Sequence, residues 1–137
     1  MRGLVIAAGL ADRVELDSAG TGSWHVGESP DPRTCAAAER RGYDLSELRA
    51  RQFQTPDFDR FDLIVAMDRA NLATLERLRG RVATPPIRLL RSFDPTAPDD
   101  AEVPDPYSGD AEDFDDVVDI CERACRGLLE HVRSIAG

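Results

Sequence analysis

Asp105 lies in a segment where a carboxyl group could be held in a fixed direction. The run Glu102-Val-Pro-Asp105-Pro-Tyr-Ser-Gly109 places a proline on each side of this aspartate. Proline fixes its own φ angle and keeps the preceding residue out of the helical region, so the run is predicted to be an extended loop. Such rigidity suits a carboxyl group that must be aimed. The same residues also fit a simple turn into a following helix, and composition alone leaves both interpretations open.

Trp24 and His25 form a second candidate, because the single tryptophan of the chain lies among glycines and not in an apolar run. An indole in a loop can form one wall of a binding pocket. A tryptophan that covers the edge of the core explains the position equally well. His25 and His131 lie far apart, and neither has a metal-ligand spacing to a second histidine or to a Cys-x-x-Cys unit. We therefore expect no metal site and no cofactor.

None of the three cysteines has the surroundings of a reactive thiol. Cys121 and Cys125 lie one helical turn apart on an apolar face, which predicts buried, reduced thiols and a poor disulfide geometry. Cys35 and Arg41 have five residues between them, the spacing of a loop that surrounds phosphate with backbone amides. However, the intervening Ala36-Ala-Ala-Glu39 favours a helix, in which those amides bond internally. Cys35 is therefore not expected to be a nucleophile.

Size and charge restrict the class of protein. A chain of 137 residues with 42% apolar residues can fill the core of one domain without disulfides or metals. Its formal net charge is −9, so its overall field repels nucleic acid and anionic membranes. No stretch approaches the ~18 continuous apolar residues of a membrane span, and the start has no processing site. We expect one domain over residues 1–137, located in the cytoplasm, with no nucleic-acid or membrane partner.

Alternating strands and helices must position the candidate residues. Val14-Glu-Leu-Asp17 alternates apolar and acidic residues and runs into a glycine-containing segment, which predicts a strand followed by a loop. Asp31 and Pro32 have the residue types of a helix cap and a first helical residue, and Gly42 ends that helix. The other predicted elements are strands at 63–67 and 87–90, a helix capped by Asp68, and a long helix that begins near Asp110.

This alternation predicts an α/β fold, in which a parallel sheet has helices on both faces. Ligands of such folds bind at the carboxyl ends of the strands.

Several segments carry a family resemblance, and they occur in the same order over nearly the whole chain. They are Asp17-Ser-Ala-Gly-Thr21, Trp24-His-Val-Gly27, Ser29-Pro-Asp-Pro-Arg33, Ala50-Arg-Gln52, Phe61-Asp-Leu-Ile-Val-Ala-Met-Asp68, Ser92-Phe-Asp-Pro95 and Asp105-Pro-Tyr107. These segments resemble the low molecular weight protein tyrosine phosphatases. The resemblance implies a three-layer α/β fold with a four-stranded parallel sheet, in which a first strand leads to a Cys-x5-Arg-Ser loop. That strand and that loop have no counterpart in this sequence, whose first residues align with the middle of the family's first helix.

The resemblance also implies roles for individual residues. Asp105 resembles the general acid that protonates the departing tyrosyl oxygen and then, as a base, activates water. Trp24 and Tyr107 resemble the aromatic walls that flank the substrate ring, and Ser18 resembles a member of the network that supports the phosphate loop. The implied substrate is a phosphotyrosine protein or a small aryl phosphate, hydrolysed through a cysteinyl-phosphate. No residue of this chain corresponds to the nucleophile.

The sequence departs from the family pattern at two further positions. Leu48 occupies the place of a histidine that supports the phosphate loop, and Ser108 occupies the place of a second tyrosine.

The missing first strand lies in the middle of the family's sheet. Without it, the two strands on either side would lie about 9–10 Å apart with unpaired backbone groups. We therefore expect a full-length phosphatase whose start was placed at an internal methionine or whose gene was truncated, and we expect the chain as given to be inactive.

Two other classes of protein remain as alternatives to a truncated phosphatase. A genuinely shortened protein could bind a partner without catalysis, and it would then need a partner strand, supplied by a homodimer. An arsenate reductase-like protein would use a nucleophilic cysteine with resolving cysteines in a mobile segment. Cys121 and Cys125 on a core helix fit that second alternative poorly.

Overall fold

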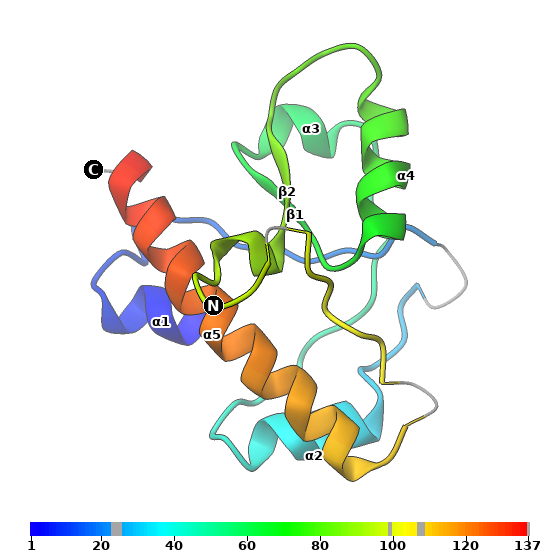
Figure 1. Ribbon diagram of the computed structural model, residues 1–137, viewed down its shortest axis with the longest axis vertical. Helices are drawn as coiled ribbons and strands as arrows, with labels where there is room; N and C mark the ends of the chain where they lie inside the picture. The colour runs from blue at the N-terminus through cyan, green and yellow to red at the C-terminus, as the bar shows by residue number, and fades with distance from the viewer. Residues whose placement is uncertain (23–25, 99, 107–108, 137) are drawn as a thin grey trace.

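Strands and helices alternate along the chain in the computed structural model, which describes residues 1–22, 26–98, 100–106 and 109–136 (Figure 1). The elements are α1 (Arg2–Ala7), α2 (Pro32–Glu39), α3 (Asp57–Arg60), β1 (Ile64–Ala66), α4 (Arg69–Arg79), β2 (Ile87–Leu89), the 3-10 helix η1 (Leu90–Phe93) and α5 (Ala111–Ala136). Across the described residues, no helix is long and apolar enough to cross a membrane.

β1 and β2 form a parallel pair between two hydrophobic clusters, with Ile64 opposite Ile87. Ile64 and Ala66 belong to a cluster that includes Leu75 of α4, whereas Val65 packs against a second cluster that includes residues of α5. Successive side chains of a strand point to opposite faces, so β1 is buried on both of its faces. Figure 1 shows α4 beside the strand pair and α5 running past η1. The predicted α/β fold with a parallel sheet is confirmed.

Two helices begin at the predicted caps. The carboxylate of Asp31 accepts a hydrogen bond from the Arg33 N–H at 2.8 Å, and Pro32 is the first residue of α2. The carboxylate of Asp68 accepts one from the Asn71 N–H at 2.7 Å at the start of α4. Each cap satisfies a backbone donor that has no partner within the first turn of its helix. Local residue types were therefore sufficient to place these helix starts.

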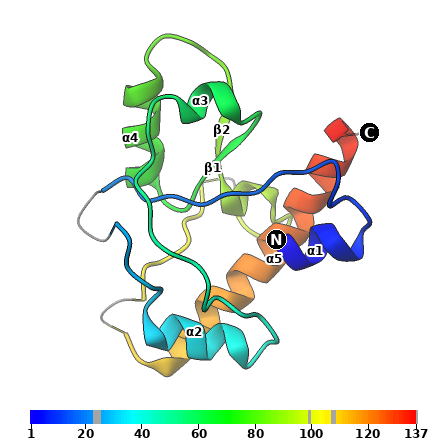
Figure 2. The same cartoon turned by 180° about the vertical axis from the view of Figure 1, so that it is seen from behind.

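α5 is the long helix predicted to begin near residue 110, and it packs against both α1 and α2. At the start of α5, the Asp110 N–H donates to Asp113 Oδ2 at 3.1 Å, and the Asp113 N–H donates to Asp110 Oδ1 at 3.2 Å. Figure 2 shows α2 against the N-terminal part of α5 and α1 against a later part. Arg40, which follows α2, forms an ion pair with Asp115 of α5 at 2.5 Å.

The strand predicted at residues 14–17 is not formed. Among the described residues, this part of the chain has a single parallel bridge, between Gly20 and Gln52, and the sheet consists of β1 and β2. A strand exists only where its backbone pairs with a neighbour about 4.8 Å away, and an alternating sequence pattern indicates the facing of side chains without supplying that neighbour. The sheet described here therefore has two of the four strands that the family resemblance implies.

Candidate functional site

The loop that carries Asp105 is attached to the carboxyl end of β1. The Val103 N–H donates to the carbonyl oxygen of Met67, the residue after β1, at 2.8 Å. The Val103 side chain is buried in the cluster formed with η1 and α5. Residues 101–106 form neither helix nor strand, as predicted, and Asp105 is exposed. An exposed carboxyl group thus follows from a buried anchor at the edge of the sheet where α/β folds bind ligands.

The two sequence interpretations of the Pro-Asp-Pro run are compatible in the structure. The turn into α5 comes after Asp105, where the Gly109 N–H donates to the Pro106 carbonyl oxygen at 2.7 Å. The segment therefore turns the chain and also presents a carboxyl group. The predicted aromatic walls, Trp24 and Tyr107, lie outside the described residues.

Loop segments that are far apart in the sequence are joined by backbone hydrogen bonds. The Gly20 N–H donates to the Arg51 carbonyl oxygen at 2.8 Å, and the Phe53 N–H donates to the Gly20 carbonyl oxygen at 2.8 Å. The Gly27 N–H donates to the Ala50 carbonyl oxygen at 2.7 Å. These bonds hold the glycine-containing loop, the segment before α2 and the segment before α3 together.

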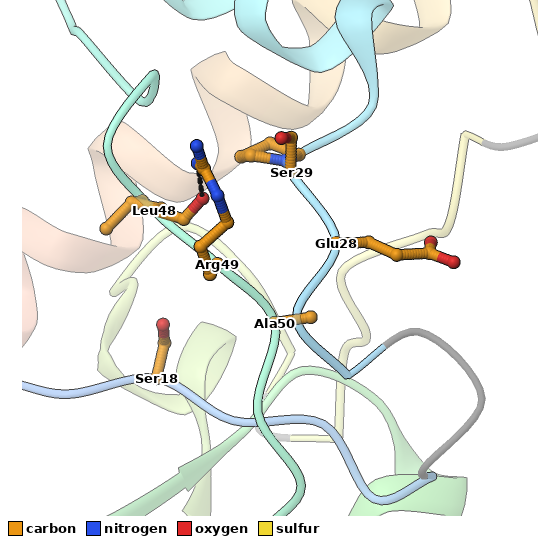
Figure 3. A pocket seen from close by; sticks show the side chains of 7 residues that line it. Ser18, Glu28, Ser29, Leu48, Arg49 and Ala50 are labelled. Carbon is orange, nitrogen blue, oxygen red and sulfur yellow. Dashed lines mark hydrogen bonds between the residues drawn. The ribbon is translucent and has the colours of Figure 1, made fainter.

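A cavity of about 200 Å³ lies between these segments (Figure 3). The Ser18 side chain points toward Leu48 and Arg49. The Arg49 guanidinium donates to the carbonyl oxygens of Ser46 at 2.9 Å and Leu48 at 2.6 Å. The cavity is lined by Ser18, Glu28, Ser29, Pro30, Leu48, Arg49 and Ala50. The predicted loop-support serine and the leucine at the position of the expected histidine thus lie in one place, beside hydroxyl and guanidinium donors that suit an anionic or backbone acceptor.

Arg51 fixes the segment on one side of this cavity, a role that the sequence analysis did not assign. Its guanidinium donates to Asp17 Oδ2 at 3.1 Å and to Asp57 Oδ2 at 3.0 Å, and Asp57 is only 7% exposed. Burial raises the pKa of Asp57, but hydrogen bonds from the Arg51 side chain and the Gln54 N–H outweigh burial and hold the pKa below its ordinary value. The chain positions of these residues form no recognisable motif, so only the folded structure identifies the ion pairs.

The cavity and the loop of residues 101–106, which carries Asp105, are separate but adjacent. Among the described residues, those that line the cavity do not include Asp105. Residues 101–106 run beside residues 26–30 in both Figure 1 and Figure 2. In Figure 3, the Glu28 side chain points toward the yellow trace of the loop that carries Asp105. The segment around Glu28 therefore lies between the cavity and the loop that carries Asp105.

Cys35 and Cys121 do not lie in the surroundings of a reactive thiol. Cys35 lies within α2, where its N–H donates to the Asp31 carbonyl oxygen at 3.0 Å, and Arg41 forms an ion pair with Asp119. This confirms that Cys35 and Arg41 do not form a phosphate loop. Burial raises the pKa of the Cys121 thiol to about 11, and the neighbouring Cys125 adds to the shift. A thiol with such a pKa is a poor nucleophile at neutral pH.

Comparison with known proteins gives a consistent result. The profile of the low molecular weight phosphotyrosine protein phosphatase family matches residues 1–135. A low molecular weight protein-tyrosine-phosphatase of Streptomyces coelicolor is 48% identical over 134 residues, which cover 96% of this chain and 81% of that protein. A low molecular weight phosphotyrosine protein phosphatase of Sus scrofa is 38% identical, over 96% of this chain and 83% of that protein.

The fold gives the same result as the sequence. The crystal structure of a protein tyrosine phosphatase from Entamoeba histolytica superimposes with a TM-score of 0.90 at 32% identity, over 97% of this chain and 84% of that one. A match over residues 1–135, together with relatives of this similarity, establishes the family. The chain belongs to the low molecular weight phosphotyrosine protein phosphatases.

Proposed function

We propose that this chain supplies the acid–base part of a site that hydrolyses phosphotyrosine or a small aryl phosphate. The observation that carries the proposal is an exposed carboxyl group, Asp105, on a proline-bracketed loop that is hydrogen-bonded to the carboxyl end of β1. Trp24 and Tyr107 are proposed to flank the substrate ring, and Ser18 is proposed to support the phosphate-binding loop. These three assignments rest on the family to which the chain belongs.

The proposed reaction has two steps. In the first, a cysteine thiolate attacks phosphorus, the bond from phosphorus to the tyrosyl oxygen breaks, and protonated Asp105 gives its proton to that oxygen. In the second, the Asp105 carboxylate takes a proton from water, whose oxygen attacks the cysteinyl-phosphate and releases inorganic phosphate and the thiolate. The 137 residues contain no Cys-x5-Arg-Ser sequence to provide the thiolate. We therefore propose that the chain by itself does not catalyse hydrolysis and that its activity depends on such a loop.

The proposal is tested with two forms of the protein. The 137-residue chain is assayed alone with p-nitrophenyl phosphate and a phosphotyrosine peptide. It is assayed again after fusion to the strand and Cys-x5-Arg-Ser loop that the family resemblance implies. We expect no turnover from the first form and turnover from the second. In the fused form, Asp105→Asn should reduce kcat/KM for phenyl phosphate by about 10²–10⁴, the usual contribution of a positioned acid. Turnover by the chain alone, or an unchanged rate in Asp105→Asn, would contradict the proposal.

A catalytically silent binding protein is the second candidate. It is favoured by Leu48, which occupies the cavity wall where the family places a histidine, and by the absence of a nucleophile from the sequence. This candidate predicts that the chain alone binds a phosphotyrosine peptide without turnover and sediments as a homodimer. A monomer without measurable peptide binding would eliminate it. An arsenate reductase-like activity is less well supported, because Cys121 and Cys125 pack against the core from α5.

A further inference from the structure

The backbone just before Asp105 is held by arginines from two different elements. The carbonyl oxygen of Glu102 accepts a hydrogen bond from Arg91 Nη1 at 3.0 Å. The carboxylate of the same residue accepts one from Arg69 Nε at 2.6 Å. Arg91 belongs to η1, which follows β2, and Arg69 is the first residue of α4, which follows β1 through two residues. Both anchors therefore begin at the carboxyl ends of the two strands, and both act on the residue three positions before Asp105.

A third contact completes this attachment. The Val103 N–H donates to the Met67 carbonyl oxygen at 2.8 Å, and the Val103 side chain is buried at 7% exposure. After this residue the path to Asp105 crosses only Pro104, whose φ angle is fixed by its ring. A movement of the Glu102–Val103 backbone is therefore transmitted to the Asp105 carboxyl group with little local freedom to absorb it.

The position of Arg91 carries an energetic cost. Its Nε is buried and has no hydrogen-bond partner among the described residues. A buried donor without a partner destabilises a folded protein, because that donor was hydrogen-bonded to water in the unfolded chain. The side chain provides a directed hydrogen bond from Nη1 to the Glu102 carbonyl oxygen, and its charge also acts favourably on the buried carboxylate of Asp94. A half-buried guanidinium that reaches residues 101–106, called the acid loop here because they carry Asp105, is suited to fixing the position of that loop.

We propose that Arg91 is a positioning residue for the general acid and that Arg69 is a second, weaker anchor of the same loop. The assignment rests on the proposed function, because it takes Asp105 as the acid. Arg69 is 66% exposed, so we expect its ion pair with Glu102 to hold the loop measurably but less strongly than the hydrogen bond from Arg91. A variant without Arg91 still has the Asp105 carboxyl group, but we expect that group to lie farther from the leaving oxygen. A displacement of about 1 Å is enough to reduce a rate by ~10².

The position of the loop is tested first on the 137-residue chain, without reference to activity. Arg91→Met is compared with Arg88→Met, since Arg88 also lies partly buried near η1, with its guanidinium over the Phe93 ring at 4.2 Å, and has no described bond to residues 101–106. Amide hydrogen exchange at Val103 should be at least about tenfold faster in Arg91→Met and unchanged in Arg88→Met, because local opening exposes this N–H. Equal exchange in the two variants would overturn the proposal.

The catalytic consequence is tested in the fused form described above, with two leaving groups. Phenol leaves poorly and needs the proton, whereas p-nitrophenol leaves well without it. Arg91→Met should lower kcat/KM about tenfold or more for phenyl phosphate and less than about threefold for p-nitrophenyl phosphate. Arg91→Lys, which keeps a donor for the Glu102 carbonyl oxygen, should recover most of the phenyl phosphate rate, and Arg88→Met should change neither rate.

The outcomes separate this inference from the proposed function. If Asp105→Asn lowers kcat/KM equally for both substrates, the assignment of Asp105 as the acid fails. If Asp105→Asn lowers kcat/KM mainly for phenyl phosphate but Arg91→Met lowers kcat/KM equally for both substrates, only the positioning role fails. Should Arg91→Met not fold, Arg69→Met removes an exposed anchor without disturbing the core. A selective loss in that variant supports the proposal, and the absence of selectivity contradicts it.

Discussion

Gly127 is predicted to be indispensable for the packing of α5 against η1. A Cβ atom added at this position would lie 1.7 Å from the carbonyl oxygen and 2.7 Å from the carbonyl carbon of Phe93. Ordinary contact begins near 3.4 Å, so the two backbones would have to separate by 3.4 − 1.7 = 1.7 Å. Both atoms belong to the main chain of η1, so a rotamer change cannot relieve the clash. Separation would open the cluster that includes Leu90, Leu128 and the Phe93 ring.

The magnitude follows from two opposing effects. Replacing glycine by alanine within a helix stabilises the helix by about 1 kcal/mol. Overpacking costs up to about 3 kcal/mol, and the upper value applies because backbone must move. Gly127→Ala is therefore expected to lower the free energy of unfolding by about 2 kcal/mol, or the Tm by roughly 8 °C for a chain of this size. Urea denaturation followed by circular dichroism measures the difference.

Gly3→Ala is the matched control. Gly3 also lies in a helix, but a Cβ atom there would meet nothing within 4 Å. This variant should be neutral or more stable by up to about 1 kcal/mol. If Gly127→Ala were as stable as the original chain, or gained stability as Gly3→Ala is expected to, the close approach of α5 and η1 would not be a feature of the folded protein.

Two further predictions concern ionisable groups. The pKa of Asp57 is held below the ordinary aspartate value of 3.8. The ionised carboxylate therefore contributes stability that is present above pH 3.8 and is lost as the pH falls through the lower folded-state pKa. Asp57→Asn should therefore lower the free energy of unfolding by about 1–3 kcal/mol at pH 7, and the difference from the original chain should shrink in acid. Parallel curves of stability against pH for the two chains would contradict this reasoning. The Cys121 pKa rises from 9.0 to about 11, a difference of 2, so its thiolate population at pH 8 should be about 100-fold below that of an unburied cysteine. Iodoacetamide labelling followed by mass spectrometry should be correspondingly slow at Cys121 in the folded chain and fast in urea, and rapid labelling of the folded chain would refute the assignment.

Much of the fold was predictable because its signals are local. The caps at Asp31 and Asp68 depend on side chains that bond to backbone donors two or three residues away. The strand around Val65 was recognisable because burial on both faces requires a continuous apolar run. The strand at 14–17 was predicted wrongly because pairing depends on a neighbour elsewhere in space, which an alternating pattern does not contain.

The candidate site was only partly predictable, for a related reason. Two prolines around Asp105 indicated an extended loop, and residues 101–106 form neither helix nor strand. The anchors of that loop were not apparent, because Arg91 and Glu102 lie eleven positions apart without any periodic relation. The same holds for Arg51 and Asp17, which are thirty-four positions apart. The roles assigned to Trp24 and Tyr107 remain predictions, because neither residue lies within the described part of the chain.

The sequence by itself thus determined the family, the α/β class with most of its elements, and the residue types available for chemistry. All of these depend on residue identity and on short-range regularities of the chain. Only the tertiary structure decided which segments meet, including the cavity that brings Ser18 and Leu48 together and the arginines that hold the acid loop. The physical reason is that directed hydrogen bonds and close backbone packing depend on distances across the fold, and those distances are set only when the core around β1 and α5 has assembled.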